Sequence, residues 1–246
     1  MSIPKIIHYC WFGGGAISPE NRKCMESWKK YCPDYKIMAW NEQNFDISTN
    51  RYVQQAYEAK RYAFVSDYVR LAVLYEYGGI YLDTDVELVR PLDELLELPG
   101  FMGFQTNNEI ATGLGFGARK GNSVVQALLR DYDALDFLKA DGSADLTPCP
   151  ERNTRVLQAL GVRKDGTRQS IAEMEIFPAE YFCPMDLYSR ELRVTPKTYS
   201  IHRYAESWKP KPSAVSRILQ RLLKKHYYTW YCPLRGRIEG RLRKRT

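Results

Sequence analysis

The sequence predicts an α/β fold with an open, mostly parallel sheet and helices on both faces. The chain has 246 residues, 44% of them hydrophobic, which is enough for one full-sized domain. Residues 4–40 contain an apolar segment, a helical segment and a second apolar segment, which is the order of a βαβ unit. Residues 78–88, GGIYLDTDVEL, add an apolar run that ends in two aspartates, as at the carboxyl end of a buried parallel strand.

The βαβ unit opens the chain. A strand is expected in residues 4–12, PKIIHYCWF, and the glycines at 13–15 end it. Ser18 as the N-cap and Pro19 at the first helical position then begin a helix. Residues 35–40, YKIMAW, are expected to form the second strand.

A long helix is expected to lead into the aspartate pair. In residues 51–79, large apolar side chains of the second half recur at i, i+4, i+7 and i+11, which predicts a helix facing a core. These side chains are Phe64, Tyr68, Leu71 and Tyr75. Gly78 and Gly79 end the helix, and residues 80–88 are expected to follow as a strand.

Further strands and helices complete the body. Strands are expected at residues 100–108, 110–119, 174–178 and 199–204, and helices at 90–98, 123–135 and 152–161. Residues 139–150 have the composition of a loop. The sequence shows no internal repeat and no linker before about residue 210, so one domain is expected over residues 1–210 and a tail over 211–246.

Composition and charge exclude several classes of protein. Residues 211–246 contain eleven Lys or Arg and one acid, whereas the rest has 25 basic and 28 acidic residues. A nucleic-acid binder would spread basic residues over its folded face, so nucleic acid is not an expected partner. The first residues do not resemble a signal peptide, and there is no apolar run of about 18 residues. The six cysteines lack zinc-site spacing, which favours reduced thiols in a cytoplasmic protein.

Asp83 and Asp85 are candidate metal ligands. In a strand they would point to the same side with Cα atoms about 6.6 Å apart. Two carboxylates at a buried strand end require a cation, and oxygen ligands favour Mg²⁺ or Mn²⁺ shared with substrate phosphates. Two alternatives are a solvent-exposed strand end and the DxD of phosphatases that form an aspartyl-phosphate. Those phosphatases require Thr or Val where this chain has Glu87.

Three segments, in the same order along the chain, resemble the DxD glycosyltransferases of family 32. They are IHYCWFGG (7–14), SDYVRLAVLYEYGGIYLDTDVEL (66–88) and IHRYAESW (201–208). This family includes bacterial capsular polysaccharide sugar transferases, yeast mannosyltransferases and, more distantly, the glucosylating clostridial toxins. The resemblance implies a GT-A fold, a nucleoside diphosphate sugar donor, a divalent metal that is usually Mn²⁺, and retention of the anomeric configuration.

The resemblance also implies roles for single residues. Asp85 corresponds to the direct metal ligand, and Asp83 to the carboxylate that bridges ribose, sugar and hydrated metal. Asp67 and Arg70 correspond to the sugar-binding pair. They are neighbours at i and i+3 of a helix, and the alternative is a surface ion pair. Trp11 corresponds to the aromatic that stacks on the base, and the alternative is a core tryptophan.

The last of the three segments corresponds to the motif that closes over the pyrophosphate. His202 would complete the metal shell, while Ser207 and the indole N–H of Trp208 would donate to phosphate oxygens. Arg203 and Tyr204 stand where many family members have His and Trp, and Arg203 could itself pair with phosphate.

The expected function is metal-dependent transfer of a hexose from a nucleoside diphosphate sugar, with UDP favoured, to a hydroxyl of a growing glycan. Mn²⁺ or Mg²⁺ would be the cofactor. The acceptor, a polysaccharide of the capsule type that is carried on a lipid, is expected to contact residues 105–119 and 139–190. Two other classes remain open, namely a non-catalytic polyanion- or membrane-binding protein and a metal-dependent phosphatase.

The tail is expected to hold the protein on the inner face of the membrane as a peripheral protein. An apolar stripe at helical spacing, a basic face and several following aromatics predict a helix that lies on an anionic bilayer. The stripe consists of Val215, Ile218, Leu219, Leu222 and Leu223. The alternative is a C-terminal helix packed on the body.

Overall fold

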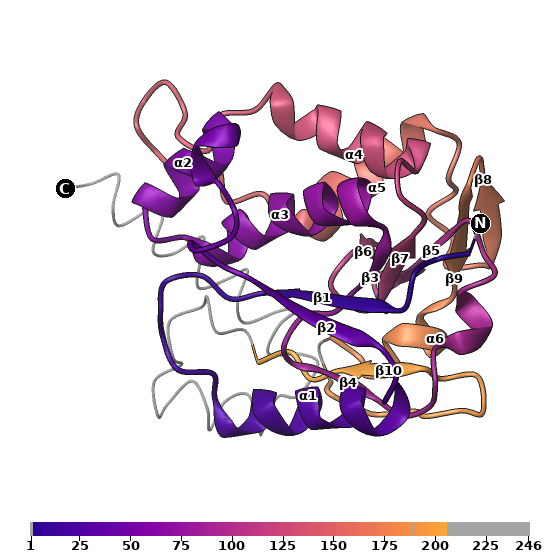
Figure 1. Cartoon of the computed structure of the whole chain (residues 1–246). Helices are drawn as coiled ribbons and strands as arrows, with labels where there is room; N and C mark the ends of the chain where they lie inside the picture. The colour runs from indigo at the N-terminus through magenta and orange to yellow at the C-terminus, as the bar shows by residue number, and fades with distance from the viewer. Residues whose placement is uncertain (1, 188, 206–246) are drawn as a thin grey trace.

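The computed structural model describes residues 2–187 and 189–205, and Figure 1 shows how their elements are arranged. The strands are β1 (Ile6–Cys10), β2 (Lys36–Trp40), β3 (Gly79–Tyr81), β4 (Val86–Leu88), β5 (Gly100–Phe104), β6 (Ile110–Ala111), β7 (Phe116–Ala118), β8 (Gln169–Ile171), β9 (Met174–Phe177) and β10 (Ser200–His202). The α-helices are α1 (Pro19–Tyr31), α2 (Arg51–Glu58), α3 (Tyr62–Tyr77), α4 (Ser123–Asp133), α5 (Cys149–Ala159) and α6 (Ala179–Phe182). Short 3₁₀ turns lie at η1 (Ile47–Thr49) and η2 (Asp93–Leu95).

The main sheet has the strand order β2-β1-β3-β7-β5-β9-β8 in the described residues, and β6 pairs with β5. β1 is parallel to both β2 and β3, and β5 is parallel to β9. β7, β6 and β8 are antiparallel to their partners. Most strands therefore point in one direction, and the expected open, mostly parallel sheet is confirmed.

Helices cover both faces of this sheet (Figure 1), as expected. One face packs against α2, α3, α4 and α5 around a core that includes Val65 and Leu74, both fully buried. The other face packs against α1, and the small antiparallel sheet of β4 and β10 lies between them. Trp28 of α1 is fully buried there, and its indole N–H donates to the carbonyl of Val86 at 2.7 Å.

The helix signals in the sequence are found in place. The Ser18 hydroxyl accepts the backbone N–H of Asn21 at 3.1 Å, and Pro19 is the first residue of α1. Gly78 ends α3 with φ at +67°, a conformation that favours glycine, and its N–H donates to the carbonyl of Leu74. The helix expected in the second half of residues 51–79 is α3, and a separate helix, α2, precedes it, with Lys60 between the two at a φ of +56°.

Two of the other expected elements are shorter than the sequence pattern indicated. Residues 90–98 form only the turn η2 instead of a helix. Residues 110–119 form two short strands, β6 and β7, with residues 112–115 between them. The predicted tail, residues 211–246, lies outside the described residues.

Candidate functional site

Residues 80–88 do not form one strand, so this expectation is wrong. The chain stays hydrogen-bonded to β1 up to Leu82, whose N–H donates to the carbonyl of His8 at 3.1 Å. A turn then follows, in which the N–H of Val86 donates to the carbonyl of Asp83 at 3.0 Å, and β4 joins the other sheet. The pleat spacing of a strand therefore does not apply to Asp83 and Asp85. Because of the turn, the two carboxylates can meet different partners.

Asp83, Asp85 and His202 form one cluster. One ligand atom from each residue lies within 4.8 Å of the other two. Strand pairing brings His202 there, since β10 is antiparallel to β4 with His202 opposite Val86. His202 Nε2 lies 3.2 Å from Asp85 Oδ1. Two carboxylates and an imidazole are a donor set that suits Mn²⁺ or Mg²⁺ with further ligands from water or phosphate, so the residues present fit the expected metal.

Asp85 and His202 shift each other's pKa in opposite directions. Burial alone would raise the pKa of Asp85, but His202 and the N–H of Ala205 lower it to about 2. Burial alone would lower the pKa of His202, but the Asp85 carboxylate raises it above its ordinary value. Asp85 is therefore ionised at neutral pH, and its negative charge favours the protonated form of His202.

Arg70 connects this cluster to Asp67. Its Nη2 lies 3.1 Å from Asp67 Oδ1 and 3.2 Å from Asp83 Oδ1. The guanidinium lies over the ring of Tyr81, whose hydroxyl also donates to Asp83. Asp67 and Arg70 are 8% and 6% exposed, so the alternative of a surface ion pair is excluded. Burial raises the pKa of Asp67 to about 6, although Arg70 opposes this.

A polar layer behind Arg70 was not anticipated from the sequence. Thr112, which lies between β6 and β7, and Cys149 and Asn153 of α5 are all buried. Asn153 Nδ2 donates to the Thr112 hydroxyl at 3.2 Å, and Arg70 Nη1 is 3.5 Å from the same hydroxyl. A polar run at the start of a helix, TPCPERN, was the available signal in the sequence. It indicated a helix start but not what that helix would face.

Gly113 is a second feature that the sequence pattern did not mark as functional. Its carbonyl accepts the N–H of Asp83 at 3.0 Å. A Cβ atom at Gly113 would lie 1.9 Å from Asp83 Oδ2, so any other residue would displace that carboxylate. The strand pattern of residues 110–119 is broken at this point, which leaves room for Asp83.

Trp11 and His8 lie on β1 or at its end and differ in their surroundings. Trp11 directly follows the strand, is half-buried, and belongs to neither of the two cores that the described residues form. His8 is fully buried, and its Nδ1 accepts the indole N–H of Trp40 at 2.9 Å. Its Nε2 donates to the carbonyl of Gly78, and burial lowers the pKa of His8 to about 4. His8 is therefore a neutral residue that is buried and hydrogen-bonded within the domain.

The C-terminal motif is described only in part. His202 lies in the cluster, but Ser207 and Trp208 fall outside the described residues. Arg203 forms an ion pair with Glu87, so in this structure its guanidinium is held on β4. The five cysteines in the described part of the chain are free thiols, namely Cys10, Cys24, Cys32, Cys149 and Cys183.

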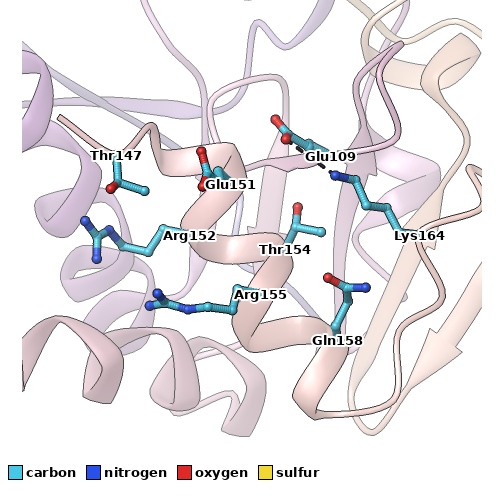
Figure 2. A pocket seen from close by; sticks show the side chains of 8 residues that line it. All are labelled: Glu109, Thr147, Glu151, Arg152, Thr154, Arg155, Gln158 and Lys164. Atoms are coloured by element: carbon cyan, nitrogen blue, oxygen red, sulfur yellow. Dashed lines mark hydrogen bonds and ion pairs between the residues drawn. The ribbon is translucent and has the colours of Figure 1, made fainter.

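A separate pocket with a volume of about 250 Å³ is lined mainly by residues of α5, together with Glu109, Thr147 and Lys164 (Figure 2). Its cationic side chains are paired with neighbours. Lys164 lies 3.5 Å from Glu109, and Arg155 lies 3.0 Å from Asp131. Arg152 is likewise 2.9 Å from Asp145. The three cationic side chains that line this pocket are thus each paired with a carboxylate.

The chain has recognisable relatives. Residues 18–101 match the family described as "Glycosyltransferase sugar-binding region containing DXD motif". Inositol phosphoceramide mannosyltransferase 3 of Schizosaccharomyces pombe is 30% identical over 151 residues, which cover 55% of this chain and 39% of that protein. An uncharacterized glycosyltransferase of Acanthamoeba polyphaga mimivirus is 26% identical over 222 residues, covering 85% of this chain and 84% of that protein.

A solved structure is also similar. It is that of the PaToxG glycosyltransferase, 20% identical, with a TM-score of 0.47 over 64% of this chain and 69% of that chain. The chain spans about two fifths of the yeast mannosyltransferase and most of the viral protein. The matched region contains Asp67, Arg70, Asp83 and Asp85. Residues 18–101 are therefore similar to the sugar-binding region of DXD-motif glycosyltransferases.

Proposed function

We propose that this protein transfers a hexose from a nucleoside diphosphate sugar, preferably a UDP-sugar, to a hydroxyl of a growing glycan with retention of configuration. One observation carries the proposal. Asp83 is shared by two groups of residues, because it pairs with Arg70 on one side and lies in the cluster with Asp85 and His202 on the other. A diphosphate near the cluster would therefore have its sugar next to Arg70 and Asp67.

Each of these residues has a proposed role. Asp85, Asp83 and His202 would hold Mn²⁺ or Mg²⁺, and a bound divalent ion supplies positive charge opposite the diphosphate leaving group. Asp67 and Arg70 would orient the sugar so that the acceptor hydroxyl meets the anomeric carbon. Arg70 would also keep Asp83 in place. Ser207 and Trp208, outside the described residues, would donate to phosphate oxygens.

Retention favours a route in which the acceptor attacks from the side of the leaving phosphate. A double displacement would need a carboxylate free to attack the anomeric carbon. Asp67 and Asp83 both pair with Arg70, and Asp85 pairs with His202 and accepts the N–H of Ala205. These contacts disfavour each of the three as a nucleophile.

The direct test is a screen of nucleotide sugars for metal-dependent hydrolysis without an acceptor. We expect release of the nucleoside diphosphate from one sugar nucleotide, in the presence of Mn²⁺ or Mg²⁺ and not after chelation. Release of phosphate from simple esters would instead support the phosphatase alternative. Hydrolysis of no nucleotide sugar, together with salt-dependent binding to polyanions, would support a non-catalytic protein.

Trp11→Ala tests the proposed stacking of Trp11 on the base. We expect the variant to bind UDP more weakly by about 1 to 3 kcal/mol, measured by calorimetry, because base stacking contributes about that much. The melting temperature should change little, since Trp11 is half-buried and outside both cores. Trp40→Phe is the control for loss of core packing, because Trp40 is 5% exposed and belongs to a core. A loss of stability in Trp11→Ala with unchanged UDP affinity would contradict stacking.

The acceptor is proposed to be lipid-linked, with the protein held as a peripheral protein on the inner membrane face by residues 211–246. The mannosyltransferase relative is named for a ceramide acceptor, which supports an acceptor at a membrane. Within the described residues, none of the helices has the length and apolar character needed to cross a bilayer. Attachment would therefore depend on the basic, amphipathic tail.

Vesicle co-sedimentation tests this attachment. The full chain is expected to sediment with anionic vesicles at low salt and less at high salt, because each basic residue near the surface contributes about 1 kcal/mol. A chain ending at Pro210 should lose this binding, and neutral vesicles should bind neither form. Equal sedimentation of the two forms, or no preference for anionic lipid, would favour a tail packed on the body.

A further inference from the structure

Tyr204 makes contacts that concern the metal cluster directly. It follows β10 by two residues, and its ring centroid lies 4.2 Å from that of His202. Its hydroxyl forms a 2.8 Å hydrogen bond with the thiol of Cys183, which is fully buried at the end of α6. The guanidinium of Arg190 lies over the Tyr204 ring, 4.7 Å from its centroid. The ring thus joins His202 to the body of the domain.

The backbone at Tyr204 has an unusual conformation. Its φ is +51°. This conformation is uncommon for residues other than glycine, above all for bulky ones, and persists where surrounding contacts impose it. The N–H of the next residue, Ala205, donates to Asp85 Oδ2 at 2.7 Å. The N–H of Arg203 donates to the Asp85 carbonyl at 2.9 Å. His202, Arg203 and Ala205 therefore each contact Asp85.

The imidazole of His202 needs such a support. A histidine that binds a metal usually donates its other ring nitrogen to an acceptor, which sets the orientation of the ring. In His202, Nε2 faces Asp85, whereas Nδ1 is buried and has no hydrogen-bond partner among residues 2–187 and 189–205. Besides the contact with Asp85, packing against the Tyr204 ring restricts rotation of the imidazole.

We propose that Tyr204 is a positioning residue for the metal site. Its aromatic ring holds His202 Nε2 toward Asp85, and its left-handed backbone places the Ala205 N–H on the same carboxylate. This inference rests on the proposed function, because it takes Asp83, Asp85 and His202 to be the metal ligands. Tyr204 would not contact the donor sugar or the ion itself.

The test distinguishes the effect of the Tyr204 ring from the effect of the backbone conformation. Tyr204→Asn removes the ring but keeps a residue that accepts a positive φ, and Tyr204→Gly does the same without a polar side chain. Tyr204→Phe keeps the ring and removes the bond to Cys183. Mn²⁺ affinity of the full-length protein is measured by calorimetry without nucleotide, and the melting temperature is measured without metal.

We expect Tyr204→Asn and Tyr204→Gly to weaken Mn²⁺ binding by about tenfold or more, as for the loss of a residue that orients a metal ligand. Tyr204→Phe should keep a Mn²⁺ affinity within about threefold of the wild-type value. Wild-type Mn²⁺ affinity in either ring-less variant would overturn the inference. So would an equal loss of affinity in Tyr204→Phe, which would assign the effect to the hydroxyl.

The outcomes also separate this inference from the proposed function. If the wild-type protein binds Mn²⁺ and Asp85→Asn does not, the metal site stands, and the Tyr204 variants decide the positioning role alone. If the wild-type protein binds neither Mn²⁺ nor Mg²⁺, both proposals fail. If Tyr204→Asn does not fold, Tyr204→Gly supplies the comparison with Tyr204→Phe, and loss of folding in both would assign Tyr204 to stability and overturn the positioning role.

Discussion

Asp85→Asn is expected to reduce metal-dependent hydrolysis of the nucleotide sugar by more than about 100-fold, which corresponds to about 2.7 kcal/mol of transition-state stabilisation. The pKa of Asp85 is lowered to about 2, so the wild-type side chain is a full negative charge at neutral pH. The substitution removes this charge from the metal cluster. It keeps an oxygen that can accept the N–H of Ala205, so the fold should be maintained.

The measurement needs a control of the same chemical type. Asp93→Asn removes a carboxylate at the surface turn η2, where Asp93 pairs with the exposed Lys5. This control should keep wild-type hydrolysis and Mn²⁺ affinity. If Asp85→Asn retained activity within about tenfold of wild type, a difference under about 1.4 kcal/mol, Asp85 would not be a metal ligand. The melting temperatures of both variants check that the comparison is made on folded protein.

Arg70→Met is expected to lower the free energy of unfolding at neutral pH by about 3 to 5 kcal/mol, because breaking a buried ion pair leaves a buried charge without its partner. Here two carboxylates lose the same cation, since Arg70 pairs with both Asp67 and Asp83. Methionine retains much of the volume and apolar length of the side chain, so the loss reports mainly on charge. Urea unfolding at pH 8 measures it, and nucleotide-sugar hydrolysis should be lost as well.

Arg155→Met is the matched control for Arg70→Met. It breaks an arginine–aspartate pair of similar length, 3.0 Å to Asp131, but the Arg155 side chain is 62% exposed. Exposed pairs contribute about 0 to 1 kcal/mol, so this variant should unfold almost as the wild-type protein does. A similar loss of stability in the two variants would contradict the role of burial in the Arg70 network.

The loss in Arg70→Met should depend on pH. Burial raises the pKa of Asp67 from its usual 3.8 to about 6, so the folded state holds this proton more tightly than the unfolded state. The stabilisation from that proton is complete below pH 4 and is lost as the pH rises through 6. Without Arg70 the pKa of Asp67 should rise further. The variant should therefore differ less from wild type at pH 5 than at pH 8.

The sequence by itself determined the secondary elements that local chemistry specifies. The Ser18–Pro19 start of α1, the end of α3 at Gly78 and the parallel pair β1 and β2 were all predictable. Caps, glycine conformations and apolar periodicity depend on neighbours within a few residues, so the sequence shows them directly. The likeness to DXD glycosyltransferases was also readable, because the motif from residue 66 to residue 88 is continuous.

Only the tertiary structure decided how the site is assembled. The apolar pattern of residues 80–88 could not show that the chain leaves the sheet after Leu82, because β4 is held by pairing with β10, far along the sequence. The same pairing brings His202 to Asp85. The burial of Arg70, the space at Gly113 and the contact of Tyr204 with His202 likewise depend on which distant segments pack together. Local sequence carries no information on such long-range packing, since the same helix and strand patterns are compatible with many neighbours.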